Sequence, residues 1–201
     1  MDLEEKLITG CLQSDRKAQR ALYEKYAPEM MNVCLRYCND RSTAKDVMQE
    51  GFIRVYQHIS KLKDAKKLKP WIKQIMVNSV LMKLRKKEAL VFYSDELLDT
   101  FQEVEVFADE SYQYTDKDLK QIFSEMPKGF KVIFNMYVFD DFSHKEIAET
   151  LRITESTSKS QLSRARSYLR KKLNALKSDY YAQPKTLGLI GSMLWIYNHI
   201  F

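Results

Sequence analysis

The fold of this chain is decided by residues 143–166, which read SHKEIAETLRITESTSKSQLSRAR. Ser143 is followed three residues later by Glu146, and this capping box predicts the start of a helix. A three-residue turn at 152–154 follows, and Thr154 is suited to cap a second helix. Two helices joined by such a short turn predict a helix-turn-helix.

The second of these helices has two contrasting faces. Its apolar residues recur at helical spacing and predict a buried face, namely Leu162, Ala165, Leu169, Leu173 and Leu176. The opposite face carries hydroxyl, amide and basic side chains, namely Thr157, Ser158, Lys159, Gln161, Ser163, Arg164 and Arg166. Such side chains suit the major groove of DNA, where Gln binds adenine and Arg or Lys binds guanine or phosphate. An ordinary helical hairpin is the alternative interpretation.

The rest of the sequence is typical of helices rather than strands. Only 5 Gly and 4 Pro occur among 201 residues, and 45% of the residues are hydrophobic, so a packed helical core is expected. We predict an all-α protein with two small helical domains joined by an acidic linker, the second a helix-turn-helix domain. The predicted boundaries are 1–90 for the first domain, 91–117 for the linker, 118–177 for the helix-turn-helix domain and 178–201 for an apolar C-terminal tail.

Charge is distributed unevenly along the chain, whose formal net charge is +6. Basic residues cluster in 61–87, against the single acid Asp64, and again in 156–177, where no acid occurs. The linker between the two domains is acidic and aromatic. Two basic surfaces divided by an acidic linker fit a bipartite contact with phosphates. For each cluster the alternative is a solvated helix face. For the linker, a solubilising tether is the alternative to a mimic of nucleic-acid charge.

The sequence contains no motif typical of an enzyme. It has no Gly-rich phosphate loop, no metal-ligand cluster and no nucleophile–base motif, so we predict no catalytic residue, metal, cofactor or small-molecule substrate. The start MDLEEKLITG lacks the apolar core of a secretory signal, which predicts a cytoplasmic protein with reduced cysteines. The apolar segment 187–201 is shorter than the about 20 residues of a membrane span. We expect it to pack on one of the domains, with a partner-binding or membrane-surface tail as the alternative.

Two sets of motifs resemble a known protein family. The promoter-binding domain of extracytoplasmic-function sigma factors of bacterial RNA polymerase is closely similar to MPKGFKVIFNMY (126–137), FSHKEIAETL (142–151) and STSKSQLSRAR (156–166). The other domain of that family is similar to ALYEKY (21–26), AKDVMQEGFIRVY (44–56) and PWIKQIMVN (70–78). The resemblance spans about residues 12–177.

The resemblance implies roles for three groups of residues. One helix face would bind the clamp helices of core RNA polymerase through Asp46, Gln49, Glu50, Phe52, Ile53 and Tyr56. A second group would melt and hold the minus-ten promoter element, namely Lys73, Asn78, Lys83, Arg85 and Lys86. A third group would read the minus-thirty-five element, namely Thr157, Ser158, Lys159, Ser160, Gln161, Ser163, Arg164 and Arg166. The implied partners are core RNA polymerase and promoter DNA, with an anti-sigma factor as a further one.

Two positions depart from the family pattern. Arg152 stands where the turn usually carries Gly, and a left-handed backbone would cost an Arg about 1 kcal/mol there, which suggests a turn of different shape. Met82 occupies a place often taken by Asp, which makes minus-ten contacts less certain. The alternative function is a stand-alone helix-turn-helix transcriptional regulator, which would bind duplex DNA tightly without polymerase.

Overall fold

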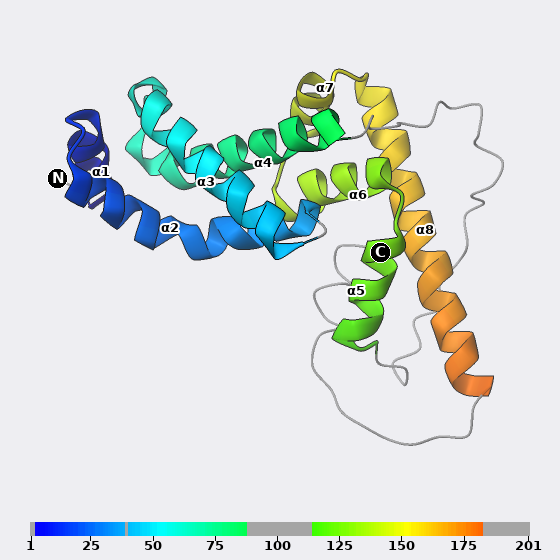
Figure 1. Cartoon of the computed structure of the whole chain (residues 1–201). Coiled ribbons are helices and arrows are strands. Elements are labelled where there is room, and N and C mark those ends of the chain that lie inside the picture. Colours follow the sequence, from blue (N-terminus) through cyan, green and yellow to red (C-terminus); the bar gives the residue numbers. More distant parts are fainter. Residues whose placement is uncertain (1–2, 39, 88–113, 183–201) are drawn as a thin grey trace. The chain divides into compact units, whose positions relative to one another are not determined.

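The structure, a computed structural model, describes residues 3–38, 40–87 and 114–182 (Figure 1). The chain divides into two compact units, Met1–Leu90 and Val91–Phe201. The described residues are helical and contain no strand, so the predicted all-α class is confirmed. Each unit is described by itself.

In its described residues, 3–38 and 40–87, the first unit has four α-helices and two short 3-10 turns. They are α1 (Leu3–Leu12), α2 (Arg16–Tyr37), α3 (Arg41–His58), η1 (Ile59–Lys61), η2 (Ala65–Lys67) and α4 (Leu68–Lys87). Asp40 caps α3, because its carboxylate accepts a hydrogen bond from the backbone N–H of Thr43 at 2.7 Å. Pro28 lies inside α2, which continues past it as one helix.

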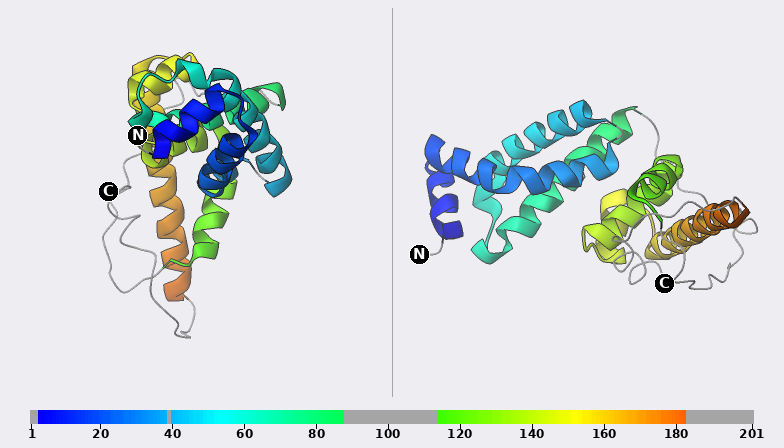
Figure 2. Two further views of the ribbon diagram at one scale, coloured as in Figure 1. Left: turned by 90° about the vertical axis from the view of Figure 1, so that its left-hand side faces the viewer. Right: turned by 90° about the horizontal axis from the view of Figure 1, so that it is seen from below.

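The core of the first unit lies where α2, α3 and α4 pack against one another, as two further views show (Figure 2). Its side chains are almost entirely apolar and include Leu22, Met30, Val55, Ile72, Met76 and Val80. Gly51 of α3 leaves room for the Met76 side chain of α4, since a Cβ added there would collide with the Sδ atom of Met76. Burial of this kind contributes about 25 cal/mol per Å² of apolar surface and holds the three helices together.

Helix α1 is fastened to α2 by a close approach and by a polar contact. Gly10 lies so near Ala18 that a Cβ at residue 10 would collide with the Ala18 Cβ. The Tyr26 hydroxyl donates to the Glu4 carboxylate at 2.8 Å, and the Lys25 ammonium lies 3.1 Å from the same oxygen. These contacts fix the crossing of α1 and α2 at the start of the unit.

The second unit contains α5 (Asp116–Glu125), α6 (Lys128–Phe134), the π-helical turn η4 (Asn135–Phe139), α7 (His144–Leu151) and α8 (Glu155–Ala182). Thr115 and Asp118 form a capping box, so α5 begins two residues before the predicted start of the domain at residue 118. Helices α6 and α7 pack on α8. Helix α5 is tied to α8 by an ion pair of 2.8 Å between Glu125 and Lys172.

The core of the second unit is built around α8 and a group of aromatic rings. Phe134 has its ring centroid 5.6 Å from that of Phe123 and 5.9 Å from that of Phe139. The buried apolar residues of α8 are Leu162, Ala165, Leu169 and Leu173, and these four of the five predicted from helical spacing are confirmed. The fifth, Leu176, is half-buried.

Two predicted segments extend past the described residues. Residues 91–113 of the predicted acidic linker 91–117 lie outside them, as does the apolar segment 187–201, so the predicted roles of both segments stay predictions. The C-terminal boundary predicted at residue 177 falls within a helix, because α8 continues to Ala182. Among the helices that the structure describes, none combines the length and apolar character needed to span a membrane.

Candidate protein and nucleic-acid interfaces

The helix-turn-helix begins and turns as the sequence predicts. Ser143 and Glu146 form the capping box of α7, in which the Ser143 backbone N–H donates to the Glu146 carboxylate at 2.8 Å. A hydrogen bond from the Ser143 hydroxyl, and then this backbone bond, hold the pKa of Glu146 below its ordinary value. At the other end of the turn, the Thr154 hydroxyl accepts from the Thr157 N–H at 3.0 Å and caps α8.

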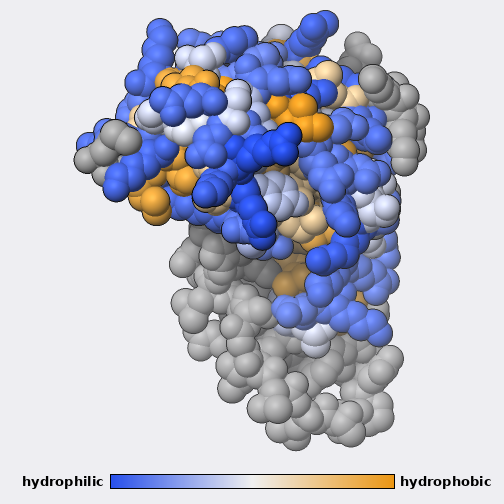
Figure 3. All heavy atoms as spheres, turned by 60° about the vertical axis from the view of Figure 1, so that its left-hand side comes forward, coloured by the Kyte–Doolittle hydropathy of each residue, from blue (hydrophilic) through white to orange (hydrophobic). Residues whose placement is uncertain are grey.

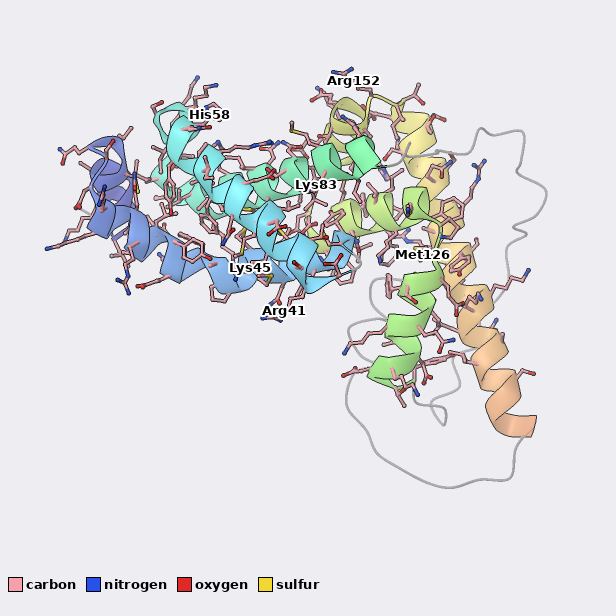
Figure 4. All side chains as sticks on the ribbon, viewed as in Figure 1. Arg41, Lys45, His58, Lys83, Met126 and Arg152 are labelled. Atoms are coloured by element: carbon pink, nitrogen blue, oxygen red, sulfur yellow. The ribbon has the colours of Figure 1, made fainter. Side chains whose placement is uncertain are left out.

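The turn keeps the left-handed conformation even though it lacks Gly. Arg152 has φ 59° and ψ 47°, so the suggestion that Arg would give a turn of different shape is wrong. The N–H groups of Arg152 and Ile153 both donate to the carbonyl of Ala148, and this pairing satisfies the end of α7. The exposed Arg152 side chain at this corner is labelled in Figure 4.

The predicted minus-thirty-five residues of α8 differ in exposure. Lys159 and Ser163 are exposed, whereas Thr157, Ser160 and Arg166 are half-buried. Gln161 is 0% exposed, and Arg164 is 4% exposed. The N-terminal half of α8 therefore offers only some of its polar side chains at the surface in this conformation.

Ser158 belongs to the buried side of α8 and not to its outer face. It lies four residues before Leu162 and seven before Ala165, so helical spacing places the three on one side. Its hydroxyl lies 2.9 Å from Nδ1 of His144, at the start of α7. The sequence analysis placed Ser158 on the outer face, although its spacing was the signal that it faces inward.

The predicted polymerase-binding residues are arranged along α3. Asp46 lies three and four residues before Gln49 and Glu50, and Ile53 lies four and three residues after them. All four are exposed, Ile53 at 55%. We call these four the α3 ridge. Most of the surface visible in Figure 3 is hydrophilic, with apolar side chains gathered in small patches.

The two aromatic residues predicted for the same contact lie deeper. Phe52 is 2% exposed and packs on Tyr23, with ring centroids 4.7 Å apart. Tyr56 is half-buried, and its hydroxyl donates to the Gln19 carbonyl at 2.9 Å. Burial raises the pKa of Tyr56 to about 12. In this structure both aromatics hold α3 against α2, and a direct contact with polymerase remains a prediction.

The predicted minus-ten residues lie on α4. Lys73, Asn78 and Lys83 are half-buried and Arg85 is exposed, while the side chain of Lys86 lies outside the described part of the chain. Lys83 is labelled in Figure 4. The sequence analysis missed Arg54 of α3, which reaches α4 and places Nη1 3.4 Å from the Ser79 hydroxyl and 2.9 Å from the Met82 sulfur.

No metal or thiol chemistry emerges from the described ranges. Within residues 3–38, 40–87 and 114–182, no three His, Cys, Asp or Glu side chains gather as a metal ion would require. Cys11, Cys34 and Cys38 are all buried. Burial raises the pKa of the Cys11 thiol, and the nearby Asp15 carboxylate adds to this shift, so the thiol form is favoured.

Two family models match the chain, one in each unit. The model of sigma-70 region 2 matches residues 22–89, and the model of sigma-70 region 4 matches residues 116–169. The first match covers most of α2, α3 and α4, which include the α3 ridge. The second covers α5 to α7 and the first half of α8, which include the helix-turn-helix.

Curated relatives and solved structures agree with these matches. The ECF RNA polymerase sigma factor SigM of Bacillus subtilis is 29% identical over 79% of this chain and 96% of its own length. The ECF sigma factor SigW of the same organism is 26% identical over 85% of this chain and 97% of its own.

Two solved structures share the fold. CnrH in complex with the cytosolic domain of CnrY has a TM-score of 0.52 at 15% identity, covering 87% of this chain and 99% of its own. The sigma factor RpoE of Bartonella quintana, solved with the anti-sigma factor NepR, has a TM-score of 0.53 at 18% identity, covering 77% and 96%. At these identities the matches show the fold alone. The two family models and the curated relatives establish that the chain belongs to the extracytoplasmic-function subfamily of bacterial RNA polymerase sigma factors.

Proposed function

We propose that this sigma factor joins core RNA polymerase through the α3 ridge and directs it to promoters through α4 and α8. The observation that carries the proposal is the exposure of Asp46, Gln49, Glu50 and Ile53 on one side of a helix whose other side is core. An acidic and amide surface with one apolar residue at its end suits a basic helical partner. A regulator that binds DNA by itself has no use for such a ridge, which favours the sigma factor over the stand-alone alternative.

The basic side chains of α4 and α8 supply the proposed DNA contacts. Lys83 and Arg85 on α4 would hold the backbone of the minus-ten element, where Asn78 offers an amide to a base. On α8, Lys159 and Ser163 are exposed and available to DNA in the present conformation. The proposed site of action is the cytoplasm, where promoter DNA and polymerase are found.

Gln161 and Arg164 would join the contact with the minus-thirty-five element only after their surroundings change. Both side chains are buried in the conformation described. Because a side chain without exposed surface cannot reach a base edge, we propose that binding to polymerase uncovers them. An anti-sigma factor is a proposed further partner, since both solved structures of similar fold, CnrH and RpoE, were determined as complexes with a second protein.

The experiment that tests this function combines association with core polymerase and selection of DNA. The purified chain is mixed with core RNA polymerase, and the complex is used to select duplexes from a promoter library with randomised minus-ten and minus-thirty-five elements. We expect enrichment of one sequence at each element with the complex and weak, unselective binding by the chain alone. Tight selection of the same duplex by the isolated chain would support a stand-alone regulator and contradict the proposal.

A matched pair of variants tests the ridge itself. Glu50→Lys reverses a charge on the ridge, whereas Glu24→Lys reverses an exposed charge on α2, on another helix of the same unit. We expect the first variant to lose co-purification with core polymerase and the second to keep it. Equal co-purification of both would remove the ridge from the proposed interface.

A further inference from the structure

His144 and Ser158 form a polar joint between the two helices of the helix-turn-helix. Nδ1 of His144, the first residue of α7, lies 2.9 Å from Oγ of Ser158, in the first turn of α8. Ser158 is 0% exposed, and His144 is half-buried. In either tautomer of the neutral imidazole, one of the two groups donates and the other accepts, so the bond is satisfied.

The place of this joint makes it relevant to DNA reading. Ser158 lies between Thr157 and Lys159, two of the residues proposed to face DNA. The two helices, which pack on each other, also bury apolar side chains such as Ile147 and Leu162, and apolar packing is non-directional. A hydrogen bond has a preferred length and angle, so it fixes the rotation of α8 on α7 where apolar packing tolerates a small turn.

The imidazole is held in place from a third element. Tyr137 of η4 stacks on His144, with ring centroids 4.6 Å apart and planes inclined by 25°. The Arg166 guanidinium of α8 lies 6.0 Å from the centroid of the Tyr137 ring. The ring of His144 is therefore fixed by η4 on its face and by α8 at Nδ1, which leaves it little freedom to rotate.

The charges around the ring favour its neutral form. Partial burial, and then the cations Lys159 and Arg166 of α8, lower the pKa of His144 below its ordinary value of 6.5, while Glu155 opposes the shift. Protonated Nδ1 would still donate to the Ser158 hydroxyl, but protonation would place a third positive charge beside Lys159 and Arg166. A charged imidazole therefore keeps the bond to Ser158 and repels these two cations of α8, which disturbs the joint.

We propose that His144 is a positioning residue which, through Ser158, sets the orientation of the first turn of α8 and thereby the sequence preference at the minus-thirty-five element. The inference rests on the proposed function of α8 and adds a residue that does not itself touch DNA. It also makes that preference depend on pH near the titration of the imidazole.

The test uses the full chain bound to core RNA polymerase and the minus-thirty-five duplex that this complex selects from a randomised library. The measured quantity is the ratio of the dissociation constants for a scrambled and the selected duplex. His144→Phe keeps a ring to stack on Tyr137 and removes Nδ1, and Ser158→Ala removes the other partner. We expect each to lower the ratio about threefold to tenfold, as the loss of one hydrogen bond implies.

Two further variants separate positioning from general stability. His144→Asn places an amide where Nδ1 stood and does not titrate, so we expect it to keep the ratio within about twofold of the wild type. Ser124→Ala removes a hydroxyl that donates to the Gln121 carbonyl within α5, away from the joint, and it should leave the ratio unchanged. Equal ratios for the wild type and the His144→Phe variant, or an equal loss in His144→Asn and His144→Phe, would overturn the proposal.

The same ratio of dissociation constants is also measured as a function of pH. If His144 had only a structural role, this ratio would not depend on its protonation. Protonation strengthens attraction to the phosphates of both duplexes alike, so this effect cancels in the ratio. As the pH falls from 7.5 to 5.5, a range chosen to span the titration of His, the wild-type ratio should decrease and that of His144→Asn should stay constant. A parallel decrease in both proteins would contradict the role of His144.

Hydrogen exchange distinguishes failure of the joint from failure of the proposed function. The Ser158 N–H donates to the Thr154 carbonyl at 3.0 Å, and we expect this amide to exchange faster in free His144→Phe than in free wild-type or Ser124→Ala protein. Unchanged exchange would refute the joint even if the chain selects promoters. A second outcome is that exchange is faster in His144→Phe but the wild-type chain with polymerase selects no duplex. This outcome would refute the proposed function and limit the role of the joint to holding α8 on α7.

Discussion

The two units differ in where they keep their polar groups. Among the described residues of the first unit, Ser79 is the buried polar side chain, and the α3 ridge lies entirely at the surface. The second unit buries several polar or charged side chains, namely Asn135, Asp140, Ser158, Gln161, Arg164 and Ser167. Three of these six belong to the stretch of α8 that is proposed to read DNA.

This difference separates two ways of building a recognition surface. In the first unit, packing and proposed recognition occupy opposite sides of α3, so each can change without the other. In the second unit, one helix supplies both the central packing element and the proposed reading element. A substitution there is expected to alter folding and recognition together, and each of the following predictions tests this contrast.

The largest expected effect is on the stability of the second unit. Phe134→Ala removes a fully buried ring that packs between Phe123 and Phe139. We expect the free energy of unfolding of this unit to fall by about 3–5 kcal/mol. Hydrogen exchange resolved by residue should show faster exchange in α6 to α8 and an unchanged first unit. Loss of protection in α2 to α4 as well would show that the two cores unfold as one.

The second effect is on association with polymerase. Asp46→Arg reverses a charge on the α3 ridge and should weaken binding to core polymerase by about 2–3 kcal/mol, because like charges would then meet. Since Asp46 is exposed, the melting temperature of the first unit should not change. Binding is measured by titration with core enzyme and melting by calorimetry. A lowered melting temperature would mean that packing and recognition are not separate on α3.

The third effect tests the opposite expectation for α8. Gln161→Ala should weaken recognition of the selected minus-thirty-five duplex by about 1–3 kcal/mol if Gln161 contacts a base. Because Gln161 is buried in the free chain, the free energy of unfolding of the second unit should change too. Both quantities are measured on the same preparation. If the affinity for the duplex changed while the free energy of unfolding stayed the same, packing and recognition would be separate on α8 as they are on α3. The two units would then not differ in this respect.

The fourth effect compares two left-handed residues, one in each unit. Ser14 has φ 58° and Arg152 has φ 59°, both in the region that favours Gly. Ser14→Gly and Arg152→Gly should each raise the free energy of unfolding of their own unit by about 0.5–1 kcal/mol. Denaturant titration measures both. A decrease for Arg152→Gly alone would show that the Arg side chain stabilises the turn by other contacts.

The smallest effect is on the response to acid. The pKa of His144 is lowered by burial, so the unfolded chain takes up a proton first and the second unit loses stability as the pH falls below 6.5. The pKa of Glu4 is lowered by the hydrogen bond from Tyr26, so the first unit loses that contribution only as the pH falls below 4.5. Calorimetry between these two values should show the second unit alone weakening. The His144→Asn variant should remove that change.

Much of the architecture could be predicted because local rules decide it. Capping at Ser143 and Thr154 depends on residues within one turn, and the apolar spacing from Leu162 to Leu173 gives the buried side of α8 directly. The left-handed turn at Arg152 was not foreseen, because a cost of about 1 kcal/mol seemed decisive. The hydrogen bonds at both ends of the turn outweigh that cost.

The site was harder to predict than the fold because exposure depends on contacts between distant residues. The inward position of Ser158 could be read from its spacing, but its partner His144 lies fourteen residues away in another helix. The burial of Gln161 and Arg164 has no signal in the local pattern, since Gln and Arg at helix positions are usually solvated. Likewise, nothing in α3 alone shows that Arg54 reaches Met82 on α4.

The absence of a side chain at Gly51 has a mechanical consequence for the first unit. The Met76 thioether of α4 fills the space where a side chain at residue 51 of α3 would stand. A side chain seated in this way resists sliding of the two helices, because a shift would leave a void or cause a clash. A partner that binds the exposed side of α3 would therefore also fix the position and tilt of α4. Docking of polymerase on the α3 ridge, as proposed, would thus also orient α4, the helix proposed to hold the minus-ten element.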